Sequence, residues 1–528
     1  MPAHKSALNT RPAQGVSARA LTSAARWLAP AALLCVACAA AAANPADGVP
    51  IVTRHQTLIA GKKFAYTTEV GRIAIRDVET GEPHGHIFYT DYRVLSGGAA
   101  QGARAAGQRS GQAERPVMFL WNGGPGAPAI WVNFDLAGPK LLEGTHLIDN
   151  TDSWLAGADL VMVDPIGTGF SRPVRRRYLK EFDGTLGDVA SVTEFVRCWL
   201  ILHDDVGAPV YLAGESWGAG RAANVAYALE KRGIQVNGLV LISGGFGLDK
   251  FYGSATLSQA VGVVDMASTA LYWHRSDPGL GRNVATIRRK AEKWVRRTYA
   301  PALAHIGQLS AAERNRIADE LARFTGIAPE LIDRRTLIIS PHQFRTELLK
   351  GEGKVLYLLD GRRTSPPSSA GKAVILDYLR QTLGYRTDLP YLGLERLTQG
   401  FAPSGTYPRG VGEQWNYATG PVTPAEVRAV IKAAIASGAG PPQLGPPLPG
   451  TRETIALNPH LRVLVAVGMY DPYDQCARGQ DTEDALPPEL KRAITFKCYA
   501  GGHAMYLGSG SIRAELTHDV MALVKSAE

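Results

Sequence analysis

Cysteine is scarce in this chain, with five residues among 528. So few cysteines exclude a small scaffold held together by many disulfides. Cys35 and Cys38 fall in an apolar N-terminal stretch, and the three later cysteines show no C-x-x-C spacing. An H-E-x-x-H motif is also absent. We therefore expect neither a metal site nor another cofactor.

Long apolar runs are missing too, except near the N-terminus. The first 43 residues hold four basic residues and no acidic one, and they end in an Ala-rich apolar stretch with an Ala-x-Ala pattern. This order is typical of a secretory signal peptide. The basic residues are Lys5, Arg11, Arg19 and Arg26.

We expect residues 1–43 to be removed by cleavage near Asn44 and the mature protein to be exported, either periplasmic or secreted. The apolar stretch is short for a membrane anchor, so no stable membrane insertion is expected after cleavage. Lipidation at Cys38 is the alternative.

Neither sign of charge dominates. The chain has 57 Lys and Arg against 48 Asp and Glu, a net charge of +9. The basic segments 175–177 and 288–297 are short, and we interpret them as solvated faces. Nucleic-acid binding is therefore not expected, and the oligomeric state is left open.

Short, nearly continuous apolar runs alternate with helical patterns from residue 117 onward, which indicates a mostly parallel sheet covered by helices on both faces. The expected helices cover 184–203, 219–232 and 511–526. Before this region, short antiparallel strands are expected at 66–70, 72–76 and 86–92, and a loop at 96–114. The apolar runs are 117–121, 160–164, 210–213, 239–243 and 462–467.

Residues 248–452 interrupt the alternation. Ser310-x-x-Glu313 and Thr423-Pro424-x-Glu426 are helix-start signals, and 438–450 is rich in Pro and Gly. We predict a core in two parts, 51–247 and 453–528, with 248–452 as a large, mainly helical cap insertion.

One short motif predicts a nucleophile. Gly214-Glu215-Ser216-Trp217-Gly218 lies between an apolar run and a helical pattern. This strand, sharp turn and helix present the serine of an α/β-hydrolase. Small residues on both sides are needed because a Cβ there would crowd the turn.

Two partners for Ser216 follow in the chain order of that fold. Asp471 comes just after the apolar run that ends at 467, and His503 follows Gly501 and Gly502 before the last expected helix. Ser, Asp and His in this order predict a catalytic triad on an α/β-hydrolase fold. Asp474 is the rival acid, and Asp471 is favoured because it is nearer the strand end.

An acyl-transfer site also needs backbone N–H groups aimed at the oxyanion. Trp217, directly after the nucleophile, should provide one. A second should come from the Gly-rich loop at 122–126, which follows the apolar run at 117–121.

Together these motifs resemble the serine carboxypeptidase family from about residue 64 to the end. The likeness is weakest in the insertion and is closest to exported bacterial members. The motifs are Trp121-Asn122-Gly123-Gly124-Pro125-Gly126, Asp164-Pro165-Ile166-Gly167-Thr168-Gly169-Phe170-Ser171, Gly214-Glu215-Ser216, Gly468-x-x-Asp471 and Gly501-Gly502-His503.

The resemblance implies hydrolysis of the C-terminal peptide bond of peptide substrates through an acyl-enzyme. It implies that Asn122, Gly123 and Glu215 hold the substrate's terminal carboxylate and that Gly124 and Trp217 give the oxyanion donors. Two carboxyl groups tolerate contact only when one is protonated, so Glu215 should act in its neutral form and activity should lean to acid pH.

The chain departs from the familiar family pattern in three places. Ala127-Pro128-Ala129 replaces Cys-Ser-Ser, so that disulfide is absent, and Trp217 replaces Tyr. A second Glu that pairs with the elbow Glu would fall near Leu136, where the nearest acid is Asp135.

These departures leave room for an esterase, amidase or acyltransferase that uses the same triad. A non-catalytic binding protein is the third reading, against which the intact Ser, Asp and His speak. Cys476 and Cys498 lie near the two proposed catalytic loops, and export would allow them to oxidise. The sequence leaves open whether they pair.

Overall fold

A computed structural model gives the fold of the part from Asn44 to the C-terminus, which is one compact unit. The predicted signal peptide at 1–43, the predicted loop at 96–114 and Asp474 lie outside the described residues. The structure describes residues 49–95, 115–244, 248, 255–367, 371–393, 415–423, 425–426, 428–429, 444–472 and 476–526.

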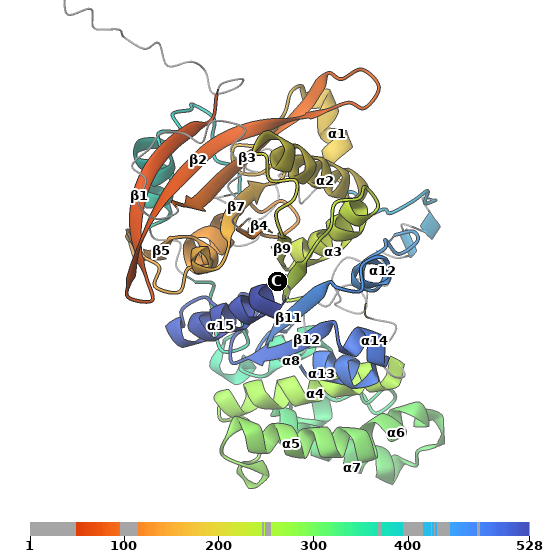
Figure 1. Ribbon diagram of the computed structural model, residues 1–528. Helices are drawn as coiled ribbons and strands as arrows, with labels where there is room; N and C mark the ends of the chain where they lie inside the picture. Colours follow the sequence, from red (N-terminus) through yellow and green to blue (C-terminus); the bar gives the residue numbers. More distant parts are fainter. Residues whose placement is uncertain are drawn as a thin grey trace, which may run out of the picture. The chain divides into compact units, whose positions relative to one another are not determined.

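The fold is built on one mixed sheet, which holds ten strands among the described residues (Figure 1). Its order is β1-β2-β3-β7-β4-β9-β10-β11-β12, with β8 paired to β3. The six strands β7, β4, β9, β10, β11 and β12 run parallel to one another. The strands β1, β2 and β3 pair antiparallel, and β3 is also antiparallel to β7. The strands are β1 Ile51–Ile59, β2 Lys62–Arg76, β3 Pro83–Val94, β4 Val117–Trp121, β7 Asp159–Asp164, β8 Arg172–Pro173, β9 Val210–Glu215, β10 Gly238–Ile242, β11 Arg462–Gly468 and β12 Ile494–Tyr499, and a separate hairpin pairs β5 Lys140–Glu143 with β6 His146–Asp149.

The prediction of two short strands at 66–70 and 72–76 is wrong. They form one strand, β2, whose residues 62–70 pair with β1 and whose residues 66–76 pair with β3. The strand continues through Gly71 because this residue pairs with Tyr89 of β3. A Cβ at Gly71 would lie 3.1 Å from the Tyr89 hydroxyl and from Pro50 Cβ, so the position leaves little room for a side chain. The sequence analysis also missed β1 and β12.

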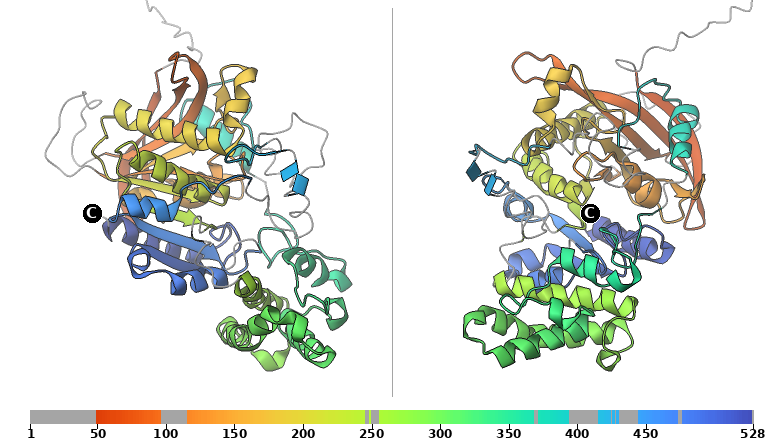
Figure 2. Two further views of the ribbon diagram at one scale, coloured as in Figure 1. Left: turned by 90° about the vertical axis from the view of Figure 1, so that its right-hand side faces the viewer. Right: turned by 180° about the vertical axis from the view of Figure 1, so that it is seen from behind.

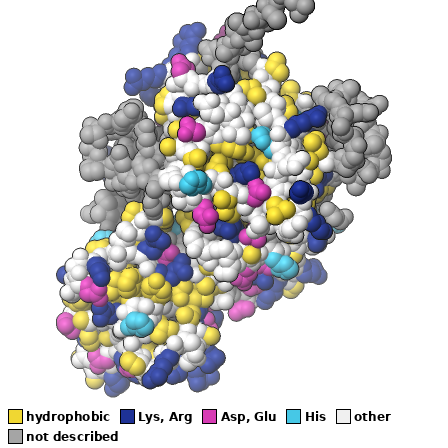
Figure 3. Space-filling model, turned by 90° about the vertical axis from the view of Figure 1, so that its left-hand side faces the viewer, with side chains coloured by type: hydrophobic (Ala, Val, Ile, Leu, Met, Phe, Trp, Pro, Cys, Tyr) yellow, Lys and Arg dark blue, Asp and Glu magenta, His cyan; other side chains and the backbone are white. Residues whose placement is uncertain are grey.

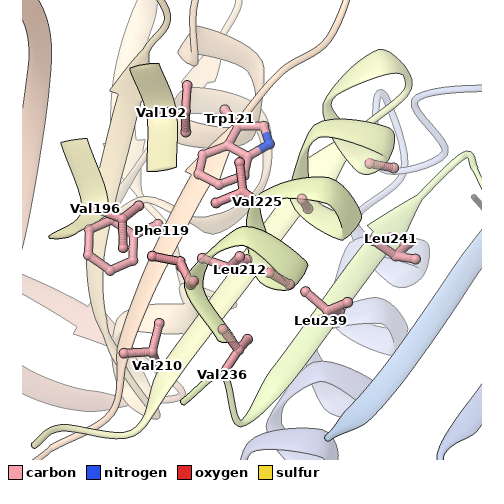
Figure 4. Close-up of a cluster of buried hydrophobic side chains, with 14 of the residues drawn as sticks. Phe119, Trp121, Val192, Val196, Val210, Leu212, Val225, Val236, Leu239 and Leu241 are labelled. Carbon is pink, nitrogen blue, oxygen red and sulfur yellow. The ribbon is translucent and has the colours of Figure 1, made fainter. Parts of the chain in front are cut away.

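The two faces of the parallel strands pack into two apolar clusters. On β4, Val117, Phe119 and Trp121 belong to one cluster, and Met118 and Leu120 to the other. The same alternation continues through β9, β10 and β11, as expected for strands buried on both faces. Figure 4 shows the first cluster, where the strands meet α2 (Thr185–Leu202) and α3 (Trp217–Glu230).

The second cluster lies under α15 (Gly510–Ser526), which supplies Leu516, Val520 and Val524. A mostly parallel sheet flanked by helices on both faces confirms the predicted α/β-hydrolase fold class. The predicted helices at 184–203, 219–232 and 511–526 correspond to α2, α3 and α15, each within two residues of the expected ends.

Between β10 and β11 the chain forms mainly helices. The first group shares a separate apolar cluster, to which Ala477 of α13 (Cys476–Ala485) also belongs. Both views in Figure 2 show these helices beside the C-terminal strands and α13. The group consists of α4 Ala255–Tyr272, α5 Val284–Trp294, α6 Ala300–Ala304, α7 Ala311–Thr325 and α8 Pro341–Glu347.

The later part of the insertion packs elsewhere. Residues of α9 (Lys372–Asp377) and of the π-helix Tyr378–Thr382 join Phe88 and Phe170 in a fourth cluster beside β2 and β3. Thr185 N donates to Asn416 O at 2.9 Å, which attaches the segment around 415–420 to the start of α2. The insertion therefore contacts the core at several separate places, and the predicted boundaries stay a prediction.

Cys476 and Cys498 form a disulfide between α13 and β12, with a Cα–Cα distance of 5.7 Å. Cys476 follows the loop that carries Asp471, and Cys498 precedes the loop that carries His503. The disulfide thus links the segment after the Asp471 loop to the strand before the His503 loop. Cys198, on α2, is a free thiol.

Basic and acidic side chains are interspersed over the face seen in Figure 3. The expectation that nucleic acid is not a partner stays a prediction. Within the described ranges, no helix combines the length and apolar character that crossing a membrane requires.

Loss of the disulfide should destabilise the fold. The disulfide links residues 22 positions apart. A cross-link of this span reduces the entropy of the unfolded chain and so raises its free energy by about 3 kcal/mol. We expect the double variant Cys476→Ala/Cys498→Ala to lose about 3 kcal/mol of unfolding free energy in urea titration, and Cys198→Ala to lose far less.

A chemical readout can contradict the pairing directly. When the unreduced protein is denatured and alkylated, the peptide with Cys198 should be modified and those with Cys476 and Cys498 should not. Alkylation of all three without a reductant would show that the disulfide does not form.

Candidate active site

Four loops meet at one edge of the sheet because they follow the carboxyl ends of parallel strands. Asn122 follows β4, Ser216 follows β9, Asp471 follows β11 and His503 follows β12. In open α/β sheets this edge is where ligands bind.

Ser216 occupies the sharp turn between β9 and α3. Its φ is 58°, a left-handed conformation that is uncommon for residues with a side chain. Ser216 N donates to Ile242 O at 2.8 Å, which fixes the turn to the next strand. A Cβ on Gly214 would lie 2.0 Å from Gly218 O, so a larger residue would push the helix start away from the strand. Ser216 and Trp217 are half-buried.

The Gly-rich loop after β4 lies directly against this turn. A Cβ on Gly123 would be 2.5 Å from Trp217 N, so only glycine allows the approach. The next residue, Gly124, is exposed. Trp217 begins α3, and its N–H is one of the helix-start donors without an intrahelical acceptor. The two predicted oxyanion donors therefore belong to backbone segments in close contact.

Asn122 and Glu215 meet beneath the turn. The Asn122 side-chain amide donates to Glu215 Oε2 at 2.5 Å, and both side chains are buried. Asn122 Oδ1 accepts from the backbone N–H groups of Trp131 and Val132 at 3.1 and 3.2 Å, which fixes the orientation of the amide. The structure thus brings together Asn122 and Glu215, two of the three residues predicted to hold a carboxylate. The third, Gly123, lies close to the backbone of Glu215 and Trp217.

Burial raises the pKa of Glu215 above its ordinary value. The nearby Asp471 carboxyl acts in the same direction, while His503 and the Asn122 amide oppose it. Glu215 therefore stays protonated to a higher pH than an exposed glutamate.

A buried ion pair holds the Gly-rich loop from the other side. Arg221 Nε, on α3, donates to Asp188 Oδ2 on α2 at 2.6 Å, and Arg221 Nη1 donates to Asn122 O at 2.9 Å. The Trp217 side chain hydrogen-bonds to the same Asp188 carboxylate. One guanidinium and one carboxylate thus position the loop and the residue after the serine.

Asp471 and His503 are hydrogen-bonded. His503 Nδ1 lies 2.7 Å from Asp471 Oδ2, and both residues are buried. With Nδ1–H donating to the carboxylate, the other ring nitrogen is left basic, which is the tautomer a general base requires.

Ser243 connects the base to the nucleophile turn. Its backbone N–H donates to Ala466 O at 2.7 Å and its hydroxyl donates to His503 O. The preceding residue, Ile242, accepts the bond from Ser216 N. Ser243 also has a positive φ of 53°. The end of β10 therefore contacts both the serine turn and the histidine loop.

Aromatic side chains from the insertion surround Trp217. Trp415 and Tyr417 meet its ring edge to face, with centroids 6.0 and 5.5 Å apart. These three rings form an aromatic cluster that begins at the residue after Ser216. Sequence reasoning did not find Trp415 and Tyr417, because no local pattern shows that a segment 200 residues beyond the helix start returns to it.

Asp188, Arg221 and Ser243 were not predicted from the sequence either. Their contacts join segments far apart in the chain. Only the presence of a charged residue within the apolar pattern of α3 could have drawn attention to Arg221. Leu136, where a second Glu was sought, is completely buried in an apolar cluster, so no carboxyl group lies there.

A family comparison matches residues 106–237 of this chain to the serine carboxypeptidase family. The matched segment contains the loop at Asn122, the loop at Asp164 and the turn at Ser216. Asp471 and His503 lie outside it.

Curated relatives match part of the chain. A pheromone-processing carboxypeptidase kex1 of Neosartorya fischeri is 32% identical over 126 residues, 23% of this chain and 19% of the relative. The protein of that name from Talaromyces marneffei is 30% identical over 155 residues, 29% of this chain and 22% of the relative. The chain thus spans about a fifth of the length of these relatives.

Solved structures similar to this chain include the peroxisomal α/β-hydrolase Lpx1 of Saccharomyces cerevisiae and a carboxyl esterase of Bacillus coagulans. They are 10% and 12% identical, cover 87% of this chain and 89% and 98% of their own, and both have a TM-score of 0.32. Over the segment 106–237, with its Gly-rich loop and its serine turn, the chain is similar to the serine carboxypeptidase family.

Proposed function

We propose that this protein is an exported serine carboxypeptidase that removes the C-terminal residue of peptides. The observation that carries the proposal is the buried contact between the Asn122 amide and the carboxyl of Glu215, the residue directly before Ser216. A nucleophile next to a neutral carboxyl and an amide suits a substrate whose scissile bond lies close to a free carboxylate.

In the proposed reaction, Ser216 Oγ attacks the last peptide carbonyl carbon while His503 Nε2 accepts the hydroxyl proton. Asp471, hydrogen-bonded to His503 Nδ1 at 2.7 Å, fixes the imidazole tautomer and stabilises the imidazolium. The oxyanion accepts hydrogen bonds from the N–H groups of Gly124 and Trp217.

His503 then gives its proton to the departing amine, and the C–N bond breaks to leave an acyl-enzyme on Ser216. Water, deprotonated by His503, attacks the ester carbonyl and releases the shortened peptide. No step needs a metal or another cofactor.

The terminal carboxylate of the substrate accepts hydrogen bonds from the Asn122 side chain, the Gly123 backbone and protonated Glu215. The raised pKa of Glu215 supports its neutral form here. The half-buried rings of Trp217 and Tyr417 suit an apolar or aromatic side chain of the substrate.

An esterase, amidase or acyltransferase with the same triad is the second candidate. The burial of Leu136 among apolar residues favours it, because Glu215 then lacks the partner carboxyl of the familiar family pattern. Substrates without a free carboxylate would then be turned over equally well.

The choice of substrate distinguishes the two candidates. We expect an N-blocked dipeptide with a free C-terminal carboxylate to be cleaved with a kcat/KM about 10- to 100-fold above that of its C-terminal amide, since the amide loses hydrogen bonds to a charged group. Release of the C-terminal product across pH 4 to 8 measures this ratio.

Ser216→Ala is the matched control and should lower kcat about 10⁴-fold or more. Equal rates on the acid and the amide, both abolished in Ser216→Ala, would exclude the carboxylate site and favour the second candidate.

Glu215 should set the alkaline limb of the pH profile. Only its protonated form binds the substrate carboxylate, so kcat/KM should fall as the pH rises through the raised pKa of Glu215. Glu215→Gln keeps a neutral donor that cannot ionise and should remove this fall. Glu489→Gln, an exposed change on α14 (Pro488–Lys491), should leave the wild-type profile unchanged. An identical alkaline limb in Glu215→Gln would contradict the assignment.

Export requires removal of the N-terminal segment. The disulfide between Cys476 and Cys498 supports an oxidising compartment. We expect the protein recovered from outside the cytoplasm to begin at or near Asn44 by intact-mass analysis. A mass that retains residues 1–43 would contradict cleavage, and a lipid-sized mass increase on a chain beginning at Cys38 would indicate the lipoprotein alternative.

A further inference from the structure

A short piece of the insertion, residues 359–362, contacts the loops of both predicted triad partners. It follows α8 and lies between α4 and the ends of β11 and β12. Trp273, directly after α4, donates from Nε1 to Gly361 O at 2.7 Å, which fixes this piece to the helical group. We call residues 359–362 the brace.

The brace holds the histidine loop at two points. His503 N donates to Leu359 O at 2.7 Å, and Arg362 Nη1 donates to Ala500 O at 2.7 Å. A Cβ on Gly502 would lie 2.6 Å from Leu359 O and from the Asp360 Cβ, so the loop lies close against the brace. The backbone of the predicted general base is thus bonded to the insertion.

The brace also holds the aspartate loop. Gly361 N donates to Tyr470 O at 2.9 Å, one residue before Asp471. The Arg362 guanidinium lies over the Tyr470 ring, 4.8 Å from its centroid. A guanidinium over an aromatic face is attracted by the ring electrons. Arg362 therefore contacts the loops of both Asp471 and His503.

Asp360 fixes the guanidinium that makes these contacts. Arg362 Nε and Nη2 donate to the two carboxylate oxygens of Asp360 at 3.0 and 2.8 Å, and Arg362 N donates to Asp360 Oδ1 at 3.0 Å. This two-point pairing leaves Nη1 directed at Ala500 O. Lysine cannot reproduce this geometry, because a single ammonium group lacks the planar fork.

We propose that Arg362 is a positioning residue that holds the Asp471 and His503 loops in the geometry needed for catalysis. The inference rests on the proposed triad and adds that the insertion, besides contributing to the substrate surface, sets the reactivity of the nucleophile. Displacements of about 1 Å between reacting groups lower rates about 100-fold, so small movements of these loops have large effects.

The rate at which a fluorophosphonate labels the full-length protein tests this without any assumption about the substrate. Ser216 Oγ forms a bond to phosphorus, the P–F bond breaks, fluoride leaves and the serine proton passes to His503. We expect Arg362→Met to lower the second-order rate constant about 10- to 100-fold and Arg362→Lys to lower it less.

Arg363→Met is the matched control. Arg363 is the exposed neighbour, and its guanidinium bonds to Ser365 O instead of the catalytic loops. Its labelling rate should stay within about twofold of the wild-type rate. The final labelled fraction separates positioning from folding: a misfolded variant lowers the fraction that labels, whereas a displaced base lowers the rate constant while the fraction stays near that of the wild type.

The outcomes separate this inference from the proposed function. A wild-type rate constant in Arg362→Met, or a fall only in the labelled fraction, overturns the role of Arg362 and leaves the triad intact. Wild-type protein that does not react with the probe at all overturns the triad and this inference with it.

Discussion

The arrangement of the site depends on the close approach of two backbone segments, the loop after β4 and the turn at Ser216. A Cβ on Gly123 would come within 2.5 Å of Trp217 N, so the contact exists only because that side chain is absent. Asn122, Gly124 and Glu215 take their positions from the same approach. The bond from Arg221 to Asn122 O and that from the Asn122 amide to Glu215 stabilise the two segments once they are in contact.

Much of this arrangement could be predicted because it is local. The strand, sharp turn and helix around Ser216 follow from glycines and from apolar runs of the right length. Asp471 and His503 were found by their position after apolar strands, and parallel strands bring such loops to one edge of a sheet. The same reasoning failed at β2, where Gly71 was taken as a break although β3 pairs across it.

The remaining contacts could not be predicted, since they depend on how distant segments meet. Nothing in the residues around Trp415 or Arg362 shows which loop they contact, and neither lies in a periodic pattern. Asp188 and Arg221 both lie on helices whose apolar patterns were recognised, but the pairing between helices is a property of packing. The insertion is the hardest part to predict because its helical groups and loops contact the core at separate places.

Buried carboxyl groups near the site differ in their hydrogen-bond partners, although burial raises the pKa of each of them. Asp188 and Asp265 each pair with a buried arginine at 2.6 Å, Arg221 and Arg288. Glu215 has an amide as its hydrogen-bond partner and lies near the negative charge of Asp471. The guanidinium beside Asp188 or Asp265 and the amide beside Glu215 each favour the ionised carboxylate and oppose the effect of burial, whereas the nearby Asp471 raises the pKa of Glu215 and Asp265 further.

The position of the insertion also has a consequence for synthesis of the chain. β10 and β11 are adjacent in the sheet, but the ribosome makes the whole insertion between them. Until β11 emerges, the fully buried strand β10 has an unpaired apolar edge, and the face that α15 later covers is open. Such surfaces favour aggregation of partly made chains. The serine turn is complete long before its base exists, so a chain that stops within the insertion has a nucleophile without activity.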